Sequence, residues 1–380
     1  MKNIYESERD HFKWSKQKEY ISHLDNIEDD IKRKAINALS FLEVEFGAQF
    51  LKTTSINHPI RQMISNKAPF QIKDLMEFSE TLQILKKENN NYNRLIQKLL
   101  SKDNAQTEGI SLVNVARMFL KEELIVSFID EIKNKKTPDV KITNPYNKDV
   151  FYIEITKLNN SDYQKEINDN YNFFHNQFNN VQPLFSFSGK QFQLVDKKEY
   201  PGISKIIADA KKRVKENDQI IYYSDRRFNF MLAPPSYNYD FNEICERNNI
   251  RSIRFNGLPI EVDETSRINN KIVKANQIPE GENGLLFIEI SPIYFLTTDI
   301  VNAAIRLEAN IAKYKNLLGI ILFSEIVAPK EPIQVNLGNN HFFSRKTIEN
   351  LCRESLFIFN NNCDIKLSEE TLVKIYKALL

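Results

Sequence analysis

The chain has 380 residues, of which 42% are hydrophobic and 27% are charged, and its formal net charge is +2. This length exceeds what one hydrophobic core supports and predicts two or three domains, while the composition excludes wholesale disorder. The small net charge excludes a globally cationic surface, so nucleic acid would have to bind local basic patches.

The cysteines and the apolar runs argue against disulfide-rich, secreted and membrane-spanning proteins. The three cysteines, Cys245, Cys352 and Cys363, are far apart and odd in number, which argues against a disulfide framework and a Cys-based zinc site. The first residues, MKNIYESERDHFKW, are charged where a signal peptide needs an apolar core. The longest apolar run, at 317–323, is too short to cross a bilayer. We expect a soluble, cytoplasmic protein that does not bind a membrane.

The first hundred residues have apolar side chains at helical spacing and predict an α-helical N-terminal domain over 1–105. The helix expected at 27–46 has acidic residues near its start, where the helix dipole favours them. Further helices are expected at 70–87 and 93–102. The stretch SKDNAQTEG at 101–109 is polar and ends in glycine, so we expect the linker between the domains there.

From Ile110 onward, strand-like runs alternate with amphipathic helices, a pattern typical of an α/β sheet covered on both faces. We expect a core domain over 106–335, with a polar insertion at 159–184, and a C-terminal α/β extension over 336–380. The expected strands are 138–142, 149–157, 190–195, 219–224, 285–291 and 317–324, and the expected helices are 110–133, 202–217, 302–314 and 367–380.

Two carboxylates, Asp139 and Glu154, fall on the first two of these strands. By strand alternation, Glu154 projects with Tyr152 and Thr156 from an apolar strand. A charge there is costly unless it is paired or coordinated, and Mg²⁺ prefers carboxylate and carbonyl oxygens. The run NPYNKD between the strands consists of turn residues, so the two carboxylates would face each other across a hairpin. The pattern predicts a metal site.

A third carboxylate comes from the helix expected at 110–133. Glu123 shares a face with Leu112, Ala116 and Phe119 by the i, i+3, i+4, i+7 rule, and this face would pack toward the sheet. Glu122 is nearly as well placed, so the sequence leaves the choice between the two glutamates open.

The order of these residues resembles the PD-(D/E)xK nuclease superfamily, which has the restriction-endonuclease-like fold. In that family a helix Glu precedes an Asp, often after Pro, at a strand start, and a (D/E)-x-K follows on the next strand. The matching residues here are Glu123, Pro138 with Asp139, and Glu154. The resemblance covers roughly 108–225 and implies an α/β core with a mixed sheet flanked by helices, preceded by the α-helical N-terminal domain.

One position departs from the family's pattern, because Thr156 stands where the family has its Lys. Lys157 follows one residue later, on the opposite face of an ideal strand, so a bulge would have to turn it inward. The helix at 202–217 resembles the family's next helix, from which a Lys or Gln approaches the site. The candidates in that helix and in the strand that follows it are Lys205, Lys212 and Gln219. The remaining alternative is a site that has no Lys or Gln beside the carboxylates, and such a site could be catalytically inactive.

The resemblance implies an Mg²⁺-dependent endonuclease that hydrolyses phosphodiester bonds. Asp139, Glu154 and the Ile155 carbonyl would hold Mg²⁺ or Mn²⁺, which would polarise the phosphate and help generate hydroxide from water. Thr156 or a nearby Lys would orient that water or stabilise the developing charge. The implied partner is nucleic acid, DNA in preference to RNA, and we further expect a homodimer or a partner subunit. Analogy suggests a bacterial defence or mobile-element system.

Each feature also has a purely structural alternative. Asp139 could belong to a turn before a strand, Glu154 could face water on an edge strand, and the basic face of the 202–217 helix could be ordinary solvated surface. The function has an alternative of another class, a catalytically silent nuclease-fold protein that acts as a nucleic-acid-binding or scaffolding subunit. The two differ in whether a basic group reaches the carboxylates despite Thr156.

Overall fold

The structure is a computed structural model and describes residues 12–55, 57–88, 91–101, 105–130, 136–179, 185–234, 241–247, 255–259, 263–328, 330–338, 340–348 and 351–379. The chain forms two compact units. Unit 1 comprises Met1–Leu158 and Glu264–Leu380, and unit 2 comprises Asn159–Asp263. In the sequence, unit 2 is therefore an insertion within unit 1.

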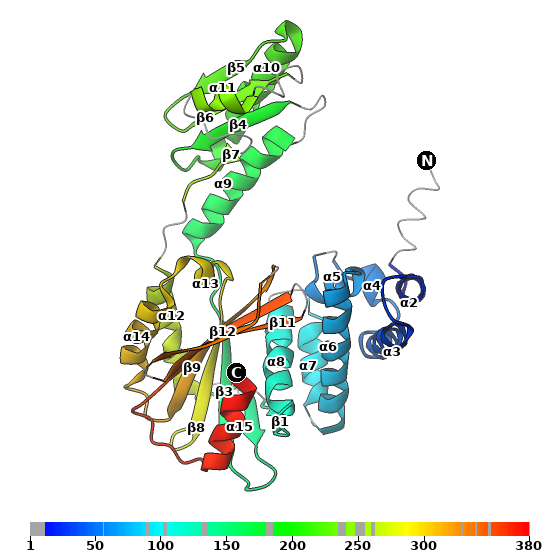
Figure 1. The fold of residues 1–380 in the computed structure, drawn as a ribbon, viewed down its shortest axis with the longest axis vertical. Coiled ribbons are helices and arrows are strands. Elements are labelled where there is room, and N and C mark those ends of the chain that lie inside the picture. The colour runs from blue at the N-terminus through cyan, green and yellow to red at the C-terminus, as the bar shows by residue number, and fades with distance from the viewer. Residues whose placement is uncertain are drawn as a thin grey trace. The chain divides into compact units, whose positions relative to one another are not determined.

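Unit 1 is built on an eight-stranded mixed sheet with the strand order β1-β2-β3-β8-β9-β12-β11-β10 (Figure 1). Strands β1, β2 and β3 form an antiparallel meander, β8 and β9 run parallel to β3, and the last three strands are antiparallel to their neighbours. The bounds are β1 Ile125–Phe128, β2 Val140–Thr143, β3 Val150–Lys157, β8 Asn283–Glu289, β9 Leu317–Val327, β10 Ile333–Gly338, β11 His341–Ile348 and β12 Leu351–Phe359.

Helices cover both faces of this sheet, which confirms the α/β fold class with a large mixed sheet flanked by helices. On the first face, α6 (Pro69–Glu88), α8 (Ala105–Leu120) and α15 (Glu369–Leu379) lie nearest the sheet. The same buried cluster continues outward into α2 (Trp14–Ser22), α3 (Asp29–Phe46), α4 (Phe50–Thr53), α5 (Pro59–Ser65) and α7 (Tyr92–Leu99). The second face packs against α12 (Glu264–Lys271), the 3₁₀ helix η3 (Ile272–Gln277), α13 (Ile293–Thr297) and α14 (Ile300–Ile311). The predicted helices at 27–46, 70–87 and 93–102 correspond to α3, α6 and α7.

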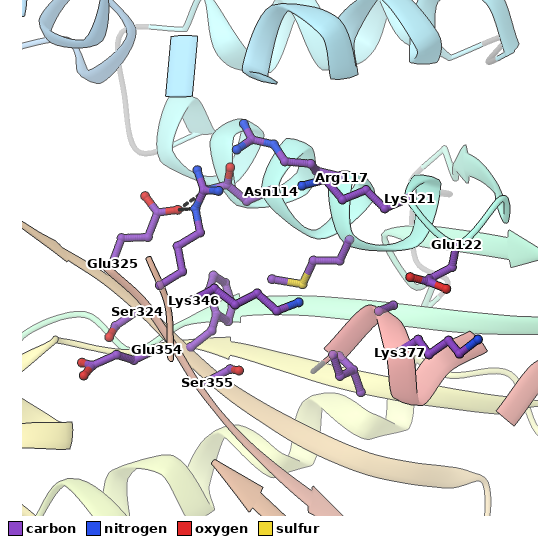
Figure 2. Close-up of a pocket in the computed structure, with 15 residues that line it drawn as sticks. Asn114, Arg117, Lys121, Glu122, Ser324, Glu325, Lys346, Glu354, Ser355 and Lys377 are labelled. Atoms are coloured by element: carbon purple, nitrogen blue, oxygen red, sulfur yellow. Dashed lines mark hydrogen bonds and ion pairs between the residues drawn. The ribbon is translucent and has the colours of Figure 1, made fainter. Parts of the chain in front are cut away.

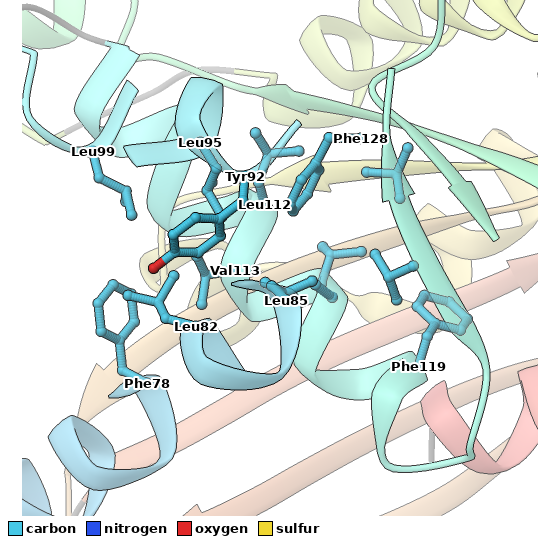
Figure 3. Close-up of a cluster of buried hydrophobic side chains, with 14 of the residues drawn as sticks. Phe78, Leu82, Leu85, Tyr92, Leu95, Leu99, Leu112, Val113, Phe119 and Phe128 are labelled. Atoms are coloured by element: carbon cyan, nitrogen blue, oxygen red, sulfur yellow. The ribbon is translucent and has the colours of Figure 1, made fainter. Parts of the chain in front are cut away.

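The core on the first face joins the N-terminal helices to the sheet. Figure 3 shows side chains from α6, α7, α8 and β1 meeting in one cluster, which includes Phe78, Tyr92 and Phe128. The Phe119 ring on α8 lies edge-on to Phe151, with ring centroids 5.7 Å apart. Because side chains from all these elements share one buried cluster, the helical N-terminal region and the sheet belong to the same unit.

On the second face, strand alternation separates two sets of side chains. In β8, Leu285 and Phe287 enter the first core, whereas Leu286 and Ile288 enter the second, which Ile268 and Ile272 of the α12–η3 segment help to build. Continuous apolar residues are expected for a parallel strand with both faces covered. The α12–η3 segment is thereby held against β3 and β8.

Unit 2 has its own four-stranded sheet, in the order β5-β6-β4-β7. Aromatic side chains from α9, β6 and β7, including Phe174, Phe228 and Phe255, form a separate core. The bounds are α9 Asp162–Asn179, β4 Ser186–Gln191, η1 Lys197–Glu199, α10 Tyr200–Asn217, β5 Ile221–Ser224, β6 Phe228–Ala233, α11 Phe241–Arg247 and β7 Phe255–Asn256. The segment predicted as a polar insertion at 159–184 thus contains a helix, and the expected 190–195 strand is shifted to β4.

Two other expectations about the elements are wrong. The predicted linker at 101–109 overlaps the first turns of α8, and the helix predicted at 110–133 ends at Leu120 before strand β1. The predicted domain division at 105 and 335 also differs from the two units. The C-terminal strands β11 and β12 lie in the main sheet, where β12 pairs with β9.

Candidate active site

The β2–β3 hairpin brings Asp139 and Glu154 together. Asp139 directly precedes β2, and Val140, the next residue, is the register partner of Ile153 in β3. The Asp139 N–H donates to the Ile153 carbonyl at 3.1 Å, and the Ile155 N–H donates to Asp139 Oδ2 at 2.9 Å. These bonds fix the Asp139 carboxylate beside β3, on the face from which Glu154 projects.

Glu154 is 3% exposed, and its Oε2 has no hydrogen-bond partner in the part of the chain that the structure describes. Burial, together with the negative charge of Asp139, raises the pKa of Glu154 from 4.5 to about 9, although the nearby Lys274 opposes this shift. This raised pKa favours the protonated form of Glu154 at neutral pH. Glu154 is not a water-facing edge residue, which removes the structural alternative for it.

Lys274 is the functional candidate that the sequence did not reveal. It lies on η3, and its Nζ is 3.9 Å from Glu154 Oε1. In the sequence it follows Glu154 only after the whole of unit 2. The sole local signal is the apolar spacing of Ile268, Ile272 and Ala275, which places a short helical segment against the sheet. Nothing in that spacing indicates that Lys274 meets the acidic pair.

Thr156, which stands where the family has its Lys, and the next residue, Lys157, lie on opposite faces of β3. The pairing of β3 with β8 runs without a register shift from Phe151 to Lys157, so the bulge that would turn Lys157 inward is absent from this strand. Lys157 instead forms an ion pair with Glu289 on the other face. Thr156 keeps the face of Glu154 and is half-buried. The expectation that Lys157 reaches the site is wrong.

Glu123 is not at the site either. α8 ends at Leu120, and Glu123 has a positive φ of 58° in the turn that follows. Its carboxylate accepts a hydrogen bond from the Tyr146 hydroxyl at 2.8 Å. Tyr146 belongs to the β2–β3 turn, whereas Asp139 lies at the other end of β2. The alternative, Glu122, lines the separate cavity of Figure 2.

Lys212, Lys205 and Gln219 all belong to unit 2. Helix α10 buries Ile203, Ile207, Ala210 and Val214 along one side. Lys212 is exposed, and its Nζ lies 3.7 Å from Glu216 Oε1. The helix that follows β3 within unit 1 is the α12–η3 segment, so Lys274 occupies the place that the sequence had assigned to Lys212.

The acidic pair fits a divalent cation of the Mg²⁺ type. Such ions take oxygen ligands, commonly one or two carboxylates together with water, and the buried Glu154 Oε2 lacks a partner among the described atoms. Within the same described residues, no three His, Cys, Asp or Glu side chains form a metal-binding group. A cation would accordingly depend on Asp139, Glu154, backbone oxygen and water, and the role of the Ile155 carbonyl stays a prediction.

A separate cavity of about 100 Å³ lies among α8, α15 and the strands β9, β11 and β12 (Figure 2). The two arginines that line it form ion pairs with Asp and Glu side chains. Arg117 Nη1 lies 3.0 Å from Asp74 Oδ1 on α6, and Arg353 Nε lies 2.8 Å from Glu325 Oε1. Arg353 also contacts Asp74. This network joins α6 and α8 to the sheet and so has a structural role.

None of the helices in the described ranges has the length and hydropathy needed to span a membrane. No family model matches the chain, and no curated protein or solved structure is significantly similar to it.

Proposed function

We propose that this chain is a metal-dependent nuclease, with Asp139 and Glu154 as the metal-binding carboxylates. The observation that carries the proposal is the buried Glu154 carboxyl, which lies beside Asp139 and has an Oε2 atom without a partner among the described residues. A buried acid is costly unless it is paired or coordinated. A divalent cation would supply that compensation and displace the proton of Glu154.

The order of elements in unit 1 supports the proposal. A helix, α8, precedes the meander, Asp139 stands at the start of β2, Glu154 lies on β3, and a helical segment leads to the parallel strand β8. This is the order that the resemblance to the PD-(D/E)xK superfamily implies, with unit 2 inserted after β3. Lys274 supplies a cationic group near the pair despite Thr156.

In the proposed reaction, a water oxygen forms a bond to phosphorus, the bond to the leaving sugar oxygen breaks, and the leaving oxygen takes up a proton. Asp139, Glu154 and the Ile155 carbonyl would hold a divalent cation, which would supply Lewis-acid polarisation of the phosphate and a lowered pKa for water at the site. Lys274 donates hydrogen bonds to phosphate oxygens where negative charge develops. Thr156 orients water from the face it shares with Glu154.

Cleavage assays test this function directly. Plasmid, linear and single-stranded DNA, and RNA, are incubated with Mg²⁺ or Mn²⁺ and with the wild type, Asp139→Asn or Glu154→Gln. We expect metal-dependent cutting by the wild type, with DNA preferred, and a loss of at least ~10²-fold in each variant because the cation loses a ligand. Lys148→Gln, an exposed position in the β2–β3 turn, serves as the matched control and should cut normally.

Equal cutting by the wild type and both carboxylate variants would place the reaction elsewhere. Tight nucleic-acid binding by a wild type that cuts nothing under any of these conditions would favour the catalytically silent, nucleic-acid-binding alternative.

A further inference from the structure

The acidic pair is bordered by lysines on the α12–η3 segment. Ile272 and Ala275 are buried in the core, and Lys271 and Lys274 lie half-buried on the neighbouring flank of the segment. Residues three apart in a helix share a face, so these two lysines project side by side. Lys274 Nζ is 3.9 Å from Glu154 Oε1, which places the flank at the acidic pair.

Strand β2 extends this cationic border. Val140 and Ile142 are buried in the first core, so Asp139 and Lys141 project together from the other face of the sheet. Two residues along a strand span about 7 Å, which makes Lys141 a neighbour of the Asp139 carboxylate. Within the described ranges, no carboxylate lies within ion-pair distance of Lys141 or Lys271. Their charges are therefore available to an anionic ligand.

We propose that Lys271 and Lys274 form a phosphate-binding flank that contacts two successive phosphates of the substrate strand. This inference rests on the proposed function. Lys274 contacts the phosphate that is cut, because it lies at the acidic pair, and Lys271 contacts the next phosphate along the strand. Lys141 adds positive potential from β2.

The spacing of the two lysines suits a strand. Three residues of helix separate their Cα atoms by about 4.5–6 Å along the axis. Successive phosphates of one strand rise by ~3.4 Å along the duplex axis and also wind around it, so they lie further apart than that rise. The flexible lysine stems span the difference.

Binding and cutting are measured with the full chain on labelled DNA and RNA strands of one length and sequence, with a nucleoside monophosphate as the small competitor. Binding uses an Asp139→Asn background, so that nothing is cut. In this background we expect Lys271→Gln to weaken strand binding ~3–10-fold and to reduce the salt slope by about 0.7–0.9, the value for one phosphate contact. Lys274→Gln should lower kcat ~10²-fold, and Lys274→Arg should restore part of it.

Lys148→Gln, at the turn end of the β2–β3 hairpin, is the matched control and should leave the affinity for the strand, the salt slope and kcat unchanged. Equal affinity and salt slope in Lys271→Gln and Lys148→Gln would overturn the inference, as would a wild type that binds no strand or binds the monophosphate equally well. A wild type that binds strands through Lys271 but cuts nothing would support the flank while contradicting the nuclease function.

Discussion

The proposed function places two opposing requirements on Glu154, because its carboxyl group is buried in the sheet and would have to ionise to bind a cation. Burial and Asp139 raise its pKa to about 9, so protons compete with metal at neutral pH. Lys274 lies close enough to favour the ionised form, yet burial outweighs it. The contribution of Glu154 to stability should therefore depend on pH and, if the proposed cation binds, on metal.

Replacing Glu154 by Gln tests this in the absence of metal. An acid with a raised folded-state pKa stabilises the fold below its unfolded pKa, near 4.5, and this contribution is lost as the pH rises toward about 9. We expect Glu154→Gln to have a higher Tm than the wild type at about pH 8.5 but not at about pH 4. The Tm difference at about pH 8.5 should be ~2–4 °C for each kcal/mol gained in unfolding free energy. Thermal melts in EDTA measure this. Glu80→Gln, on the exposed side of α6, is the control, and a Glu154→Gln difference that does not depend on pH would contradict the expectation.

At the scale of elements, the end of α8 decides which carboxylates can meet. Lys121, Glu122 and Glu123 are good helix formers, so the sequence pattern continues past the point where the chain turns. The Leu124 N–H instead bonds back to the Phe119 carbonyl at 3.2 Å, with Glu123 in a left-handed conformation. Tertiary packing of β1 overrides local propensity here, which is why the Glu123 prediction was wrong.

The β2–β3 hairpin was predictable for a physical reason. Strand alternation and a turn-rich connection both appear in the local sequence, and the hairpin forms at the expected place. The strands β10, β11 and β12 were missed as parts of the main sheet, because their pairing with β9 is a long-range contact that no local pattern records.

The ion-pair network between α6, α8 and β12 gives a prediction at the same scale. Arg117 is buried and pairs with the buried Asp74 and the half-buried Glu77, so Arg117→Met would leave both acids poorly compensated. We expect a loss of about 3–5 kcal/mol in unfolding free energy, measured by urea denaturation. Lys121→Met, which removes an exposed lysine 3.9 Å from Glu77, should cost about 0–1 kcal/mol. Similar costs for the two variants would contradict a structural role for the network.

At the scale of the whole molecule, unit 2 separates the parts of the candidate site along the chain. Glu154 precedes the insertion and Lys274 follows it, although the two side chains lie within 4 Å. Sequence reasoning took the next amphipathic helix, which contains Lys212, as the partner of the hairpin. An insertion with its own hydrophobic core is invisible to local periodicity, since its strands and helices resemble those of the surrounding unit.

The central claim, that Asp139 and Glu154 hold a divalent cation, is tested most directly by calorimetric titration of Mn²⁺ into the full-length protein at about pH 8. The account predicts saturable binding by the wild type and Lys148→Gln, with an affinity at least ~10-fold lower in Asp139→Asn and Glu154→Gln. Binding that is equal in all four proteins, or absent from the wild type, would contradict it.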